Sequence, residues 1–172
     1  MNKPFNLQQW IDANRDVLRP PVMAKPLFDN SDDYMIFVVG SPNARKDFHY
    51  NETEEFFHQL EGELHLWTID EEGRQVENVI RAGEVFLLPA RVPHSPRRPA
   101  GGVGIVVERK RPGMKDGVMW FCENCGEKLY EKYFPVEEIA NELGPVLEAF
   151  AADEDLRTCK TCGAVLELAP TT

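Results

Sequence analysis

Histidine and cysteine are scarce in this chain of 172 residues, with four of each, and long apolar runs are absent. A helix that spans a bilayer needs about 20 consecutive apolar residues. Bases are also in deficit, 19 against 29 acids, which gives a formal net charge of −10. Nucleic-acid-binding proteins normally carry a basic surface, and anionic membrane surfaces attract basic segments. We therefore expect neither nucleic acid nor a membrane among the partners of this chain.

The N-terminal segment, residues 1–5, lacks the basic n-region and apolar h-region of a signal peptide. We therefore expect a cytoplasmic protein. Thiols stay reduced in that compartment, where paired cysteines indicate metal or redox chemistry rather than disulfides. The length is sufficient for one compact domain of roughly 100–150 residues with a small appendage.

The order of predicted elements favours a mainly β fold. Asn6 is expected to cap a helix over residues 7–18. Strands are expected where glycine or proline closes β-branched and aromatic runs, at residues 34–39, 55–60, 63–69, 84–88 and 103–108. Many short strands without intervening helices are typical of a barrel or sandwich.

The pattern changes at Pro112–Gly113, which is typical of a boundary between parts of a chain. We expect a barrel over residues 1–112 and a cysteine-containing tail over residues 113–172. The tail should contain one or two short helices, the main one over residues 136–150. Pro145 is expected to kink or split this helix, because proline removes a backbone donor.

Two histidines and one glutamate have a spacing that suits a metal. His49 and Glu55 lie on adjacent stretches of predicted sheet, and His94 follows on a later strand. Such a trio can occupy one face of an Fe(II) octahedron and leave three positions open. Inward-facing side chains from separate strands converge inside a barrel. An isolated histidine is nevertheless more often a surface or core residue than a ligand, and Glu54 competes with Glu55 for the same role.

The two remaining histidines are weaker candidates. His58 lies three residues after Glu55, so in a regular strand it points to the opposite face. His65 alternates with two leucines, which leaves its side ambiguous, and we expect it at the surface or behind the ligands. Arginines near the trio can hold a carboxylate with two hydrogen bonds, but salt bridges at the rim of the barrel would give the same sequence.

The segments around these residues resemble the paired motifs of the cupin family. The spacing of Glu55 to Gly62 and that of Gly83 to His94 both fit. The resemblance implies a jelly-roll β-barrel. Two positions depart from the motifs, because Asp47 stands where histidine is usual and Arg98 where asparagine is usual. The typical four-ligand site is thereby reduced to three ligands, and Arg98, whose charge would repel a metal, is expected to serve a substrate.

Longer stretches are similar to the 3-hydroxyanthranilate 3,4-dioxygenase family, over most of the chain. They are residues 42–49, 54–62, 86–89, 94–99 and 107–109, with the N-terminal helix and the cysteine tail of the bacterial form. The resemblance implies His49, Glu55 and His94 as ligands of Fe(II). It implies Arg98 and Glu108 at the carboxylate end of the substrate, Arg45 beside the dioxygen site, and a homodimer.

The implied reaction is ring cleavage by a non-haem Fe(II) dioxygenase. The substrate would be 3-hydroxyanthranilate, and both atoms of O2 would enter the product. That product, 2-amino-3-carboxymuconate semialdehyde, cyclises to quinolinate on the kynurenine pathway to NAD. Glu55 would also lie where it could accept a proton from the substrate. The alternatives are another metal-dependent cupin dioxygenase, a metal-free epimerase with a His/Tyr pair, and a non-catalytic ligand-binding cupin.

Two C-x-x-C-G segments use all the cysteines of the chain: Cys122, Cys125, Cys159 and Cys162. Four thiolates suit zinc or a rubredoxin-type iron. A redox-active cysteine pair is the competing interpretation, which two such segments make less attractive. We expect the ion to staple a tail too small to hold a core alone. The choice between iron and zinc stays open.

Overall fold

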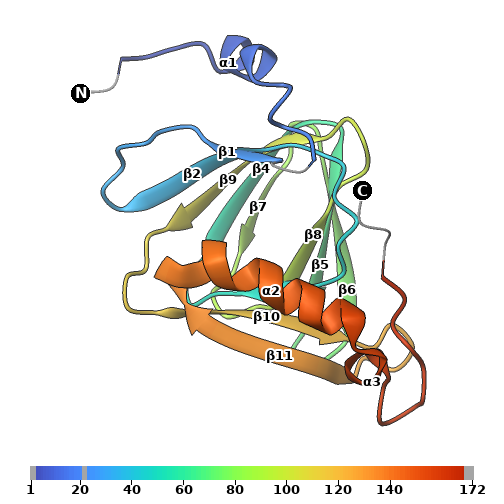
Figure 1. Ribbon diagram of the computed structural model, residues 1–172. Coiled ribbons are helices and arrows are strands. Elements are labelled where there is room, and N and C mark those ends of the chain that lie inside the picture. Colours follow the sequence, from blue (N-terminus) through green and yellow to red (C-terminus); the bar gives the residue numbers. More distant parts are fainter. Residues whose placement is uncertain (1–2, 21–22, 169–172) are drawn as a thin grey trace.

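Two antiparallel sheets form the body of the protein in the computed structural model, which describes residues 3–20 and 23–168. The first sheet is five-stranded, in the order β1 (Ala24–Pro26), β2 (Tyr34–Val39), β9 (Val103–Arg109), β4 (Glu55–Glu61) and β7 (Val85–Leu88). The second is six-stranded, in the order β11 (Lys128–Pro135), β10 (Lys115–Phe121), β3 (Phe48–Tyr50), β8 (His94–Arg97), β5 (Glu63–Ile69) and β6 (Gln75–Arg81). Figure 1 shows the two sheets facing each other. The predicted mainly β barrel is confirmed.

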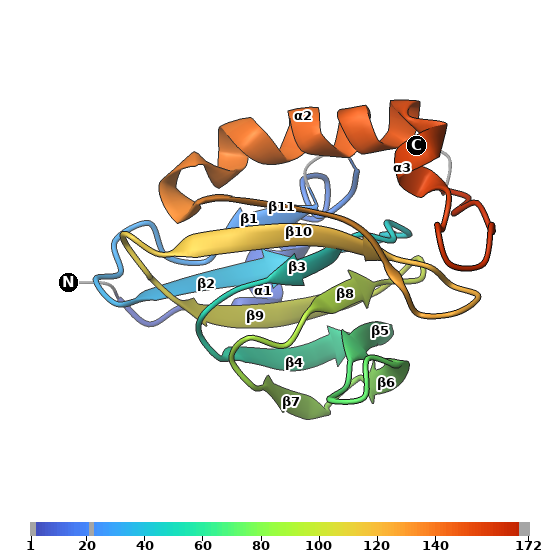
Figure 2. The same ribbon diagram turned by 90° about the horizontal axis from the view of Figure 1, so that it is seen from below.

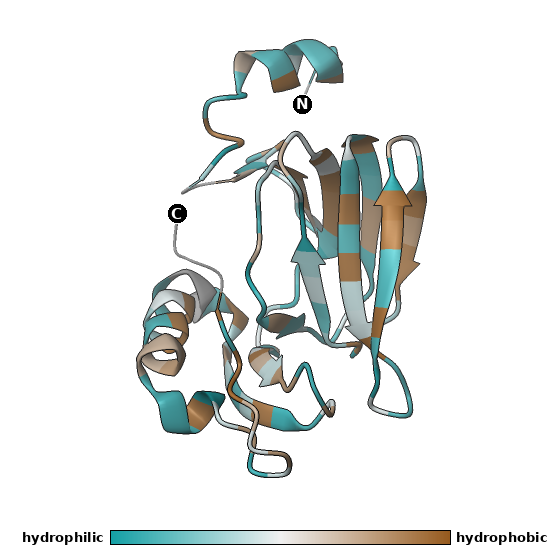
Figure 3. Cartoon of the chain, turned by 90° about the vertical axis from the view of Figure 1, so that its right-hand side faces the viewer, coloured by the Kyte–Doolittle hydropathy of each residue, from teal (hydrophilic) through white to brown (hydrophobic). Residues whose placement is uncertain are grey.

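Alternation along the strands builds the barrel interior. In β4, Glu55 and Phe57 are buried while Phe56 between them is exposed, and Figure 3 shows hydrophobic and hydrophilic bands alternating along several strands. The inward apolar side chains form one core cluster of Phe57, Leu64, Leu66, Ile80, Leu88 and Val106. Side chains two residues apart in a strand point to the same face of the sheet. Glu55 therefore points into the barrel, like Phe57 two residues later.

The N-terminal helix α1 spans Leu7–Ala13 and lies outside the barrel (Figure 1). Asn6 caps it as predicted, since its side chain accepts from the amide of Gln9 at 2.9 Å. The predicted extension to residue 18 is wrong. Asn14 ends the helix because its side-chain amide donates to the carbonyl of Trp10 at 2.7 Å and its backbone leaves the helical region. The chain then turns so that Leu18 packs in the same core cluster as Ile11.

The C-terminal part of the chain continues the second sheet. β10 pairs with β3, and β11 pairs with β10. A 3₁₀ turn (Val136–Glu138) then leads into α2 (Ile139–Ala152), which continues through Pro145 without being split, and α3 (Glu154–Arg157) follows. Figure 2 shows α2 lying along β10 and β11. None of the described helices is long and apolar enough to cross a membrane.

A separate apolar core holds α2 against these two strands. Its buried members are Val118, Trp120, Phe134, Phe150 and Leu166. The rings of Trp120 and Phe150 are stacked with centroids 4.0 Å apart and planes at 13°. The tail therefore shares a sheet with the barrel and packs its own apolar cluster on that sheet. The predicted boundary at residue 112 lies in the turn between β9 and β10.

Candidate active site

Three predicted metal-binding residues meet inside the barrel. His49 on β3 and His94 on β8 are directly opposite each other in the second sheet, with ring centroids 5.2 Å apart. Glu55 reaches them from β4 in the facing sheet, and its Oε1 lies 3.5 Å from Nδ1 of His49 and 3.2 Å from Nε2 of His94. The three potential ligand atoms all lie within 4.8 Å of one another. We call these residues the His–Glu–His cluster.

The cluster is buried and electrostatically suited to a cation. Burial raises the pKa of Glu55, but His94 and His49 lower it by more, so Glu55 is a carboxylate. Burial lowers the pKa of His49, but hydrogen bonds to Asp116 and Glu55 outweigh it and raise that pKa to about 10. A ligating imidazole must be neutral at the binding nitrogen, so a divalent cation would displace a proton from His49.

Neighbouring groups fix the orientation of each member of the cluster. The ring nitrogen of His49 that points away from Glu55, Nε2, lies 2.9 Å from Oδ2 of Asp116. The corresponding nitrogen of His94, Nδ1, lies 3.0 Å from the carbonyl oxygen of Val92. The side-chain amide of Asn51 donates to Oε1 of Glu55. Metal-binding histidines usually donate their other N–H to such an acceptor, so the donor set and its surroundings fit a divalent metal.

A cavity of about 370 Å³ adjoins the cluster. It is lined mainly by apolar side chains. Helix α2 contributes Leu143, and the strands contribute Phe37, Val39, Phe57, Val106, Val118 and Phe134. The polar members of its wall are Asn43, Arg45, Asp47, His49, Glu55, His94, Arg98 and Glu108. A mostly apolar pocket with a few convergent polar groups is typical of a small-molecule site. The structure thus brings together all the predicted residues of the catalytic site.

Arg98 is the least compensated charge in this wall. It is 4% exposed, and among the described residues its Nε has no hydrogen-bond partner. Its Nη1 has only the carbonyl oxygen of Pro96, at 3.4 Å. Burial lowers the pKa of Arg98 to about 10, against the opposing effect of the Glu55 carboxylate. An anion in the cavity would supply the partner that the guanidinium lacks.

Glu108 and Arg45 line the same cavity as the cluster. Glu108 is opposite Glu55 in the β4–β9 pairing, and burial together with the nearby Glu55 raises the pKa of Glu108. Arg45 donates from Nε and Nη2 to the two carboxylate oxygens of Asp47 at 3.0 and 2.9 Å. Asp47, the departure from the cupin motif, therefore holds an arginine at the cavity wall.

The other two histidines lie outside the cluster, as expected. His58 falls on the opposite face of β4 from Glu55. Both ring nitrogens of His65 face carboxylates, with Glu77 at 2.7 Å and Glu63 at 3.1 Å. Hydrogen bonds to these glutamates raise the pKa of His65. His65 is a partly exposed residue of the second sheet, which resolves the ambiguity in its predicted side.

The four cysteines form a second cluster, with Sγ atoms of Cys122 and Cys162 3.6 Å apart and those of Cys125 and Cys159 3.5 Å apart. Tetrahedral metal–thiolate bonds of about 2.3 Å place sulfurs roughly 3.8 Å apart. Both turns have the same construction. The amide of Gly126 donates to the carbonyl of Cys122 and that of Gly163 to Cys159, at 2.9 Å each. Both glycines have positive φ, 79° and 75°. This four-cysteine cluster fits a tetrahedral ion.

Sequence reasoning missed three polar residues behind the His–Glu–His cluster: Asn51, Arg111 and Asp116. All three are at most 3% exposed. Arg111 donates from Nε to Oδ1 of Asp116 at 2.8 Å and from Nη1 to Oε2 of Glu108 at 3.0 Å. The only signal in the sequence is that Asp116 directly precedes the apolar run at residues 117–121, and nothing distinguishes Arg111 from the nearby Arg109 and Lys110.

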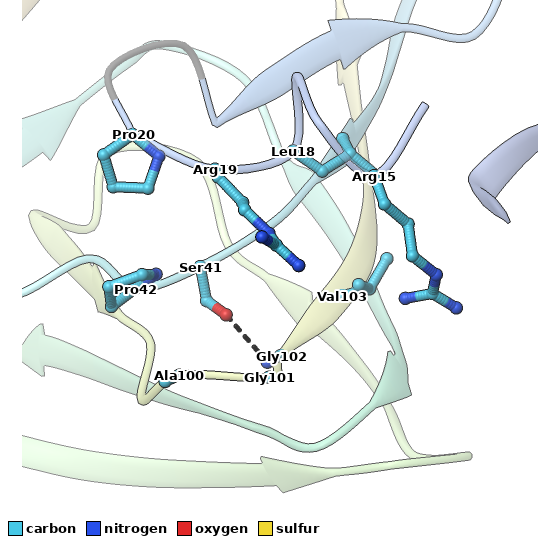
Figure 4. A pocket seen from close by; sticks show the side chains of 10 residues that line it. All are labelled: Arg15, Leu18, Arg19, Pro20, Ser41, Pro42, Ala100, Gly101, Gly102 and Val103. Carbon is cyan, nitrogen blue, oxygen red and sulfur yellow. Dashed lines mark hydrogen bonds between the residues drawn. The ribbon is translucent and has the colours of Figure 1, made fainter. Parts of the chain in front are cut away.

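A second cavity, of about 280 Å³, lies between the turn after α1 and the Gly101–Gly102 turn. Figure 4 shows the hydroxyl of Ser41 in it, which accepts from the amide of Gly102 at 2.8 Å. Arg15, another wall residue, is already paired with Asp12 and Glu61. No member of either metal-type cluster lines this cavity, so it lies apart from the chemistry described above.

Two facing antiparallel sheets that enclose a His–Glu–His cluster define a metal-dependent cupin. A model of the family described as 3-hydroxyanthranilic acid dioxygenase matches residues 1–151. This chain therefore belongs to the 3-hydroxyanthranilic acid dioxygenase family.

Relatives similar over nearly their whole length agree with that membership. The chain is 49% identical over 161 residues to the 3-hydroxyanthranilate 3,4-dioxygenase of Xanthomonas euvesicatoria pv. vesicatoria, covering 93% of this chain and 90% of that protein. It is 40% identical over 171 residues to the protein of the same name from Neurospora crassa, covering 99% and 93%. Among solved structures it is similar to a cupin-2 domain protein from Shewanella frigidimarina, with 18% identity and a TM-score of 0.48 over 61% of this chain and 100% of the other.

Proposed function

We propose that this chain is a non-haem Fe(II) dioxygenase that cleaves the ring of 3-hydroxyanthranilate with O2. The product would be 2-amino-3-carboxymuconate semialdehyde, the precursor of quinolinate on the route from tryptophan to NAD. The family membership supports the reaction. The observation in the structure that carries the proposal is Arg98, a buried guanidinium with an unpartnered Nε among the described residues, in the same cavity as the His–Glu–His cluster.

The cavity provides a binding group for each end of such a substrate. Arg98 would pair with the ring carboxylate, because a guanidinium and a carboxylate form two parallel hydrogen bonds. Glu108, opposite Glu55 across the β4–β9 pairing, would lie with Arg98 at the carboxylate end and accept a hydrogen bond from the neighbouring amine, while the hydroxyl end would face the His–Glu–His cluster. The apolar walls, including Phe57 and Val106, would hold the ring and exclude water. A cavity of about 370 Å³ has room for one small aromatic ring.

The His–Glu–His cluster would hold Fe(II) through His49, Glu55 and His94. Bound there, iron with three open positions supplies the redox chemistry of dioxygen that protein side chains lack. The chain itself orients the ring and places charge. Glu55 would accept the proton of the substrate hydroxyl, and Arg45, held by Asp47 at the cavity wall, would stabilise negative charge that develops on dioxygen.

The four-cysteine cluster would hold a second iron or a zinc with a structural role. All four ligands come from two matching turns, which leaves no open position for a substrate. Ring cleavage with incorporation of both oxygen atoms needs no external electrons, so the reaction does not require electron transfer by the four-cysteine cluster. The proposal also includes a homodimer, which the family resemblance implies, and a cytoplasmic location, which the residues at the N-terminus led us to expect.

A metal-free cupin epimerase is the main rival activity. It would need a tyrosine beside a histidine as an acid–base pair, and no tyrosine lines the cavity in the described part of the chain. A non-catalytic cupin would bind its ligand without turnover.

One experiment separates these functions. The protein is reconstituted with Fe(II) under anaerobic conditions, 3-hydroxyanthranilate is added, and air is then admitted. We expect stoichiometric oxygen uptake and formation of quinolinate. Absence of uptake with fully loaded iron would contradict the proposed activity. Binding of 3-hydroxyanthranilate without uptake would instead favour a non-catalytic cupin, and an epimerase could not turn this compound over because it has no stereocentre.

A further inference from the structure

Arg111 and Asp116 form a buried ion pair that contacts two residues of the cavity wall, His49 and Glu108. Arg111 is 3% exposed and Asp116 is fully buried. The guanidinium donates from Nε to Oδ1 of Asp116 at 2.8 Å and from Nη2 to Oδ2, which is the two-pronged geometry that arginine forms with a carboxylate. Neither residue is needed to line the cavity, so the reaction as proposed above leaves both without a role.

One end of this pair contacts a member of the His–Glu–His cluster. Oδ2 of Asp116 lies 2.9 Å from Nε2 of His49. Because that carboxylate can only accept, Nε2 carries a proton, and Nδ1, which lies 3.5 Å from Oε1 of Glu55, is the nitrogen that would give up its proton to a cation. Asp116 thereby selects the tautomer of His49 in which the nitrogen facing the cluster is free to bind a metal.

The other end contacts the carboxylate expected to face the substrate. Nη1 of Arg111 lies 3.0 Å from Oε2 of Glu108 and donates also to the carbonyl oxygen of Arg109 at 3.1 Å. A single planar guanidinium therefore holds one carboxylate behind the metal ligand and another in the cavity wall. Since the geometry of its donors is rigid, a displacement of either carboxylate is transmitted to the other.

We propose that Arg111 and Asp116 are positioning residues that link metal binding to substrate binding. Asp116 fixes the tautomer and ring plane of His49, and Arg111 sets the relative position of Asp116 and Glu108. This inference rests on the proposed function for the role of Glu108, whereas the role of Asp116 toward His49 concerns metal binding alone. A purely structural ion pair between Arg111 in the β9–β10 turn and Asp116 on β10 would stabilise the fold without affecting either binding event.

The test uses Co(II) as a probe of both metal clusters in the full-length protein. Thiolate-bound Co(II) and histidine/carboxylate-bound Co(II) have different visible spectra, so the four-cysteine cluster serves as an internal reference. The variants are Asp116→Asn, which keeps the shape of the side chain, and Arg111→Lys, which keeps the charge. The control is Arg15→Met, which breaks an ion pair with Glu61 far from the cavity.

In Asp116→Asn we expect the Co(II) affinity of the His–Glu–His cluster to fall about 10- to 100-fold, as is typical when the partner of a ligand is lost. Both oxygens of Asp116 accept from Arg111, and Oδ2 also contacts Nε2 of His49. A carboxamide has only one accepting oxygen, so its N–H2 must oppose a donor of Arg111 or of His49, and the negative charge beside His49 is lost. Thiolate binding of Co(II) should be unchanged, and Arg15→Met should alter neither affinity. Unchanged affinity at the His–Glu–His cluster, or an equal fall at both clusters, would overturn the inference.

In Arg111→Lys we expect weaker binding of 3-hydroxyanthranilate to the Co(II) protein under anaerobic conditions, as well as weaker Co(II) binding. A lysine retains the charge but cannot hold both carboxylates in a fixed geometry. If Arg111→Lys bound Co(II) and 3-hydroxyanthranilate with native affinity, a positive charge at this position would be sufficient, and the positioning role would be refuted. If the unmodified protein fails to bind 3-hydroxyanthranilate, the proposed function is refuted, while the Co(II) titration of Asp116→Asn still decides the role of Asp116.

Discussion

The two metal-type clusters of this chain are built in opposite ways. The His–Glu–His cluster draws its members from three strands in two facing sheets and opens onto a cavity. The four-cysteine cluster draws its members from two copies of one turn, each closed by the same backbone hydrogen bond. Structural sites are usually closed by four protein ligands, while catalytic sites leave positions open. The difference supports the proposal that the first cluster serves the chemistry and the second the stability of the fold, and each role can be tested.

The largest effect is expected from Glu55→Ala. This variant removes the carboxylate that contacts both histidines, so we expect loss of the metal of that cluster and a fall of turnover to background. Metal analysis should still find the ion of the four-cysteine cluster. The matched control is Glu54→Ala, because Glu54 is its exposed neighbour and should retain both metals and full activity. Loss of the thiolate-bound ion in Glu55→Ala would contradict the independence of the two clusters.

Arg98→Ala should separate substrate binding from metal binding. Hydrogen bonds to a charged partner contribute about 1.5–3 kcal/mol, so KM for 3-hydroxyanthranilate should rise roughly 10- to 150-fold. Iron content should be unchanged. Arg97→Ala provides the control, since the Arg97 guanidinium lies 5.0 Å from the ring centroid of Trp67 rather than among the residues of the cavity wall. Normal substrate affinity in Arg98→Ala would remove Arg98 from the site.

Replacing the exposed cysteines, Cys125→Ser with Cys162→Ser, should lower stability and spare the chemistry. An ion present at 100 times its Kd stabilises a fold by about 2.7 kcal/mol, so the thermal midpoint should fall by roughly 5–10 °C. Turnover per iron, measured well below that midpoint, should persist. An unchanged midpoint with halted turnover would instead give the four-cysteine cluster a functional role.

The smallest effect is expected at His65, the histidine outside both clusters. Hydrogen bonds to Glu77 and Glu63 raise its pKa in the folded state above 6.5, so the charged form stabilises the fold. This contribution, about 0.5 kcal/mol for a partly exposed pair, is complete below pH 6.5 and is lost as pH rises through the folded-state pKa. His65→Ala should therefore lower the urea midpoint slightly at pH 6 and not at pH 9. Equal effects at both pH values would exclude an electrostatic origin.

Local sequence predicted those parts of the fold that short-range rules determine. The strands over residues 34–39 and 63–69 were placed at their observed bounds because β-branched runs end at glycine or turn residues. The strands β10 and β11 were missed, because they flank the first cysteine segment and their polar and aromatic residues show no clean alternation. The predicted N-terminal helix extends beyond the observed end at Ala13, because the side chain of Asn14 bonds the carbonyl of Trp10 there. Helix propensities do not include such a contact.

The site was predictable where spacing carried the information and hidden where contacts are long-range. His49, Glu55 and His94 stand in motif positions, and so do the four cysteines. Asp116 lies 67 residues from its partner His49, and only the pairing of β10 with β3 brings them together. The division of the chain at residue 112 stays a prediction, and β10 crosses from one predicted part into the sheet of the other.

The place of β10 has a consequence for synthesis on the ribosome. The nascent chain exposes His49, Glu55 and His94 before Asp116 has been translated, and Leu143, which completes the wall of the cavity, follows later still. Folding during translation proceeds from the N-terminus. A partly made chain therefore carries a metal-binding trio without the carboxylate that orients His49. The proposed iron would then be loaded selectively only after the last strands have emerged, and a competing cation could be captured prematurely in the interval before that.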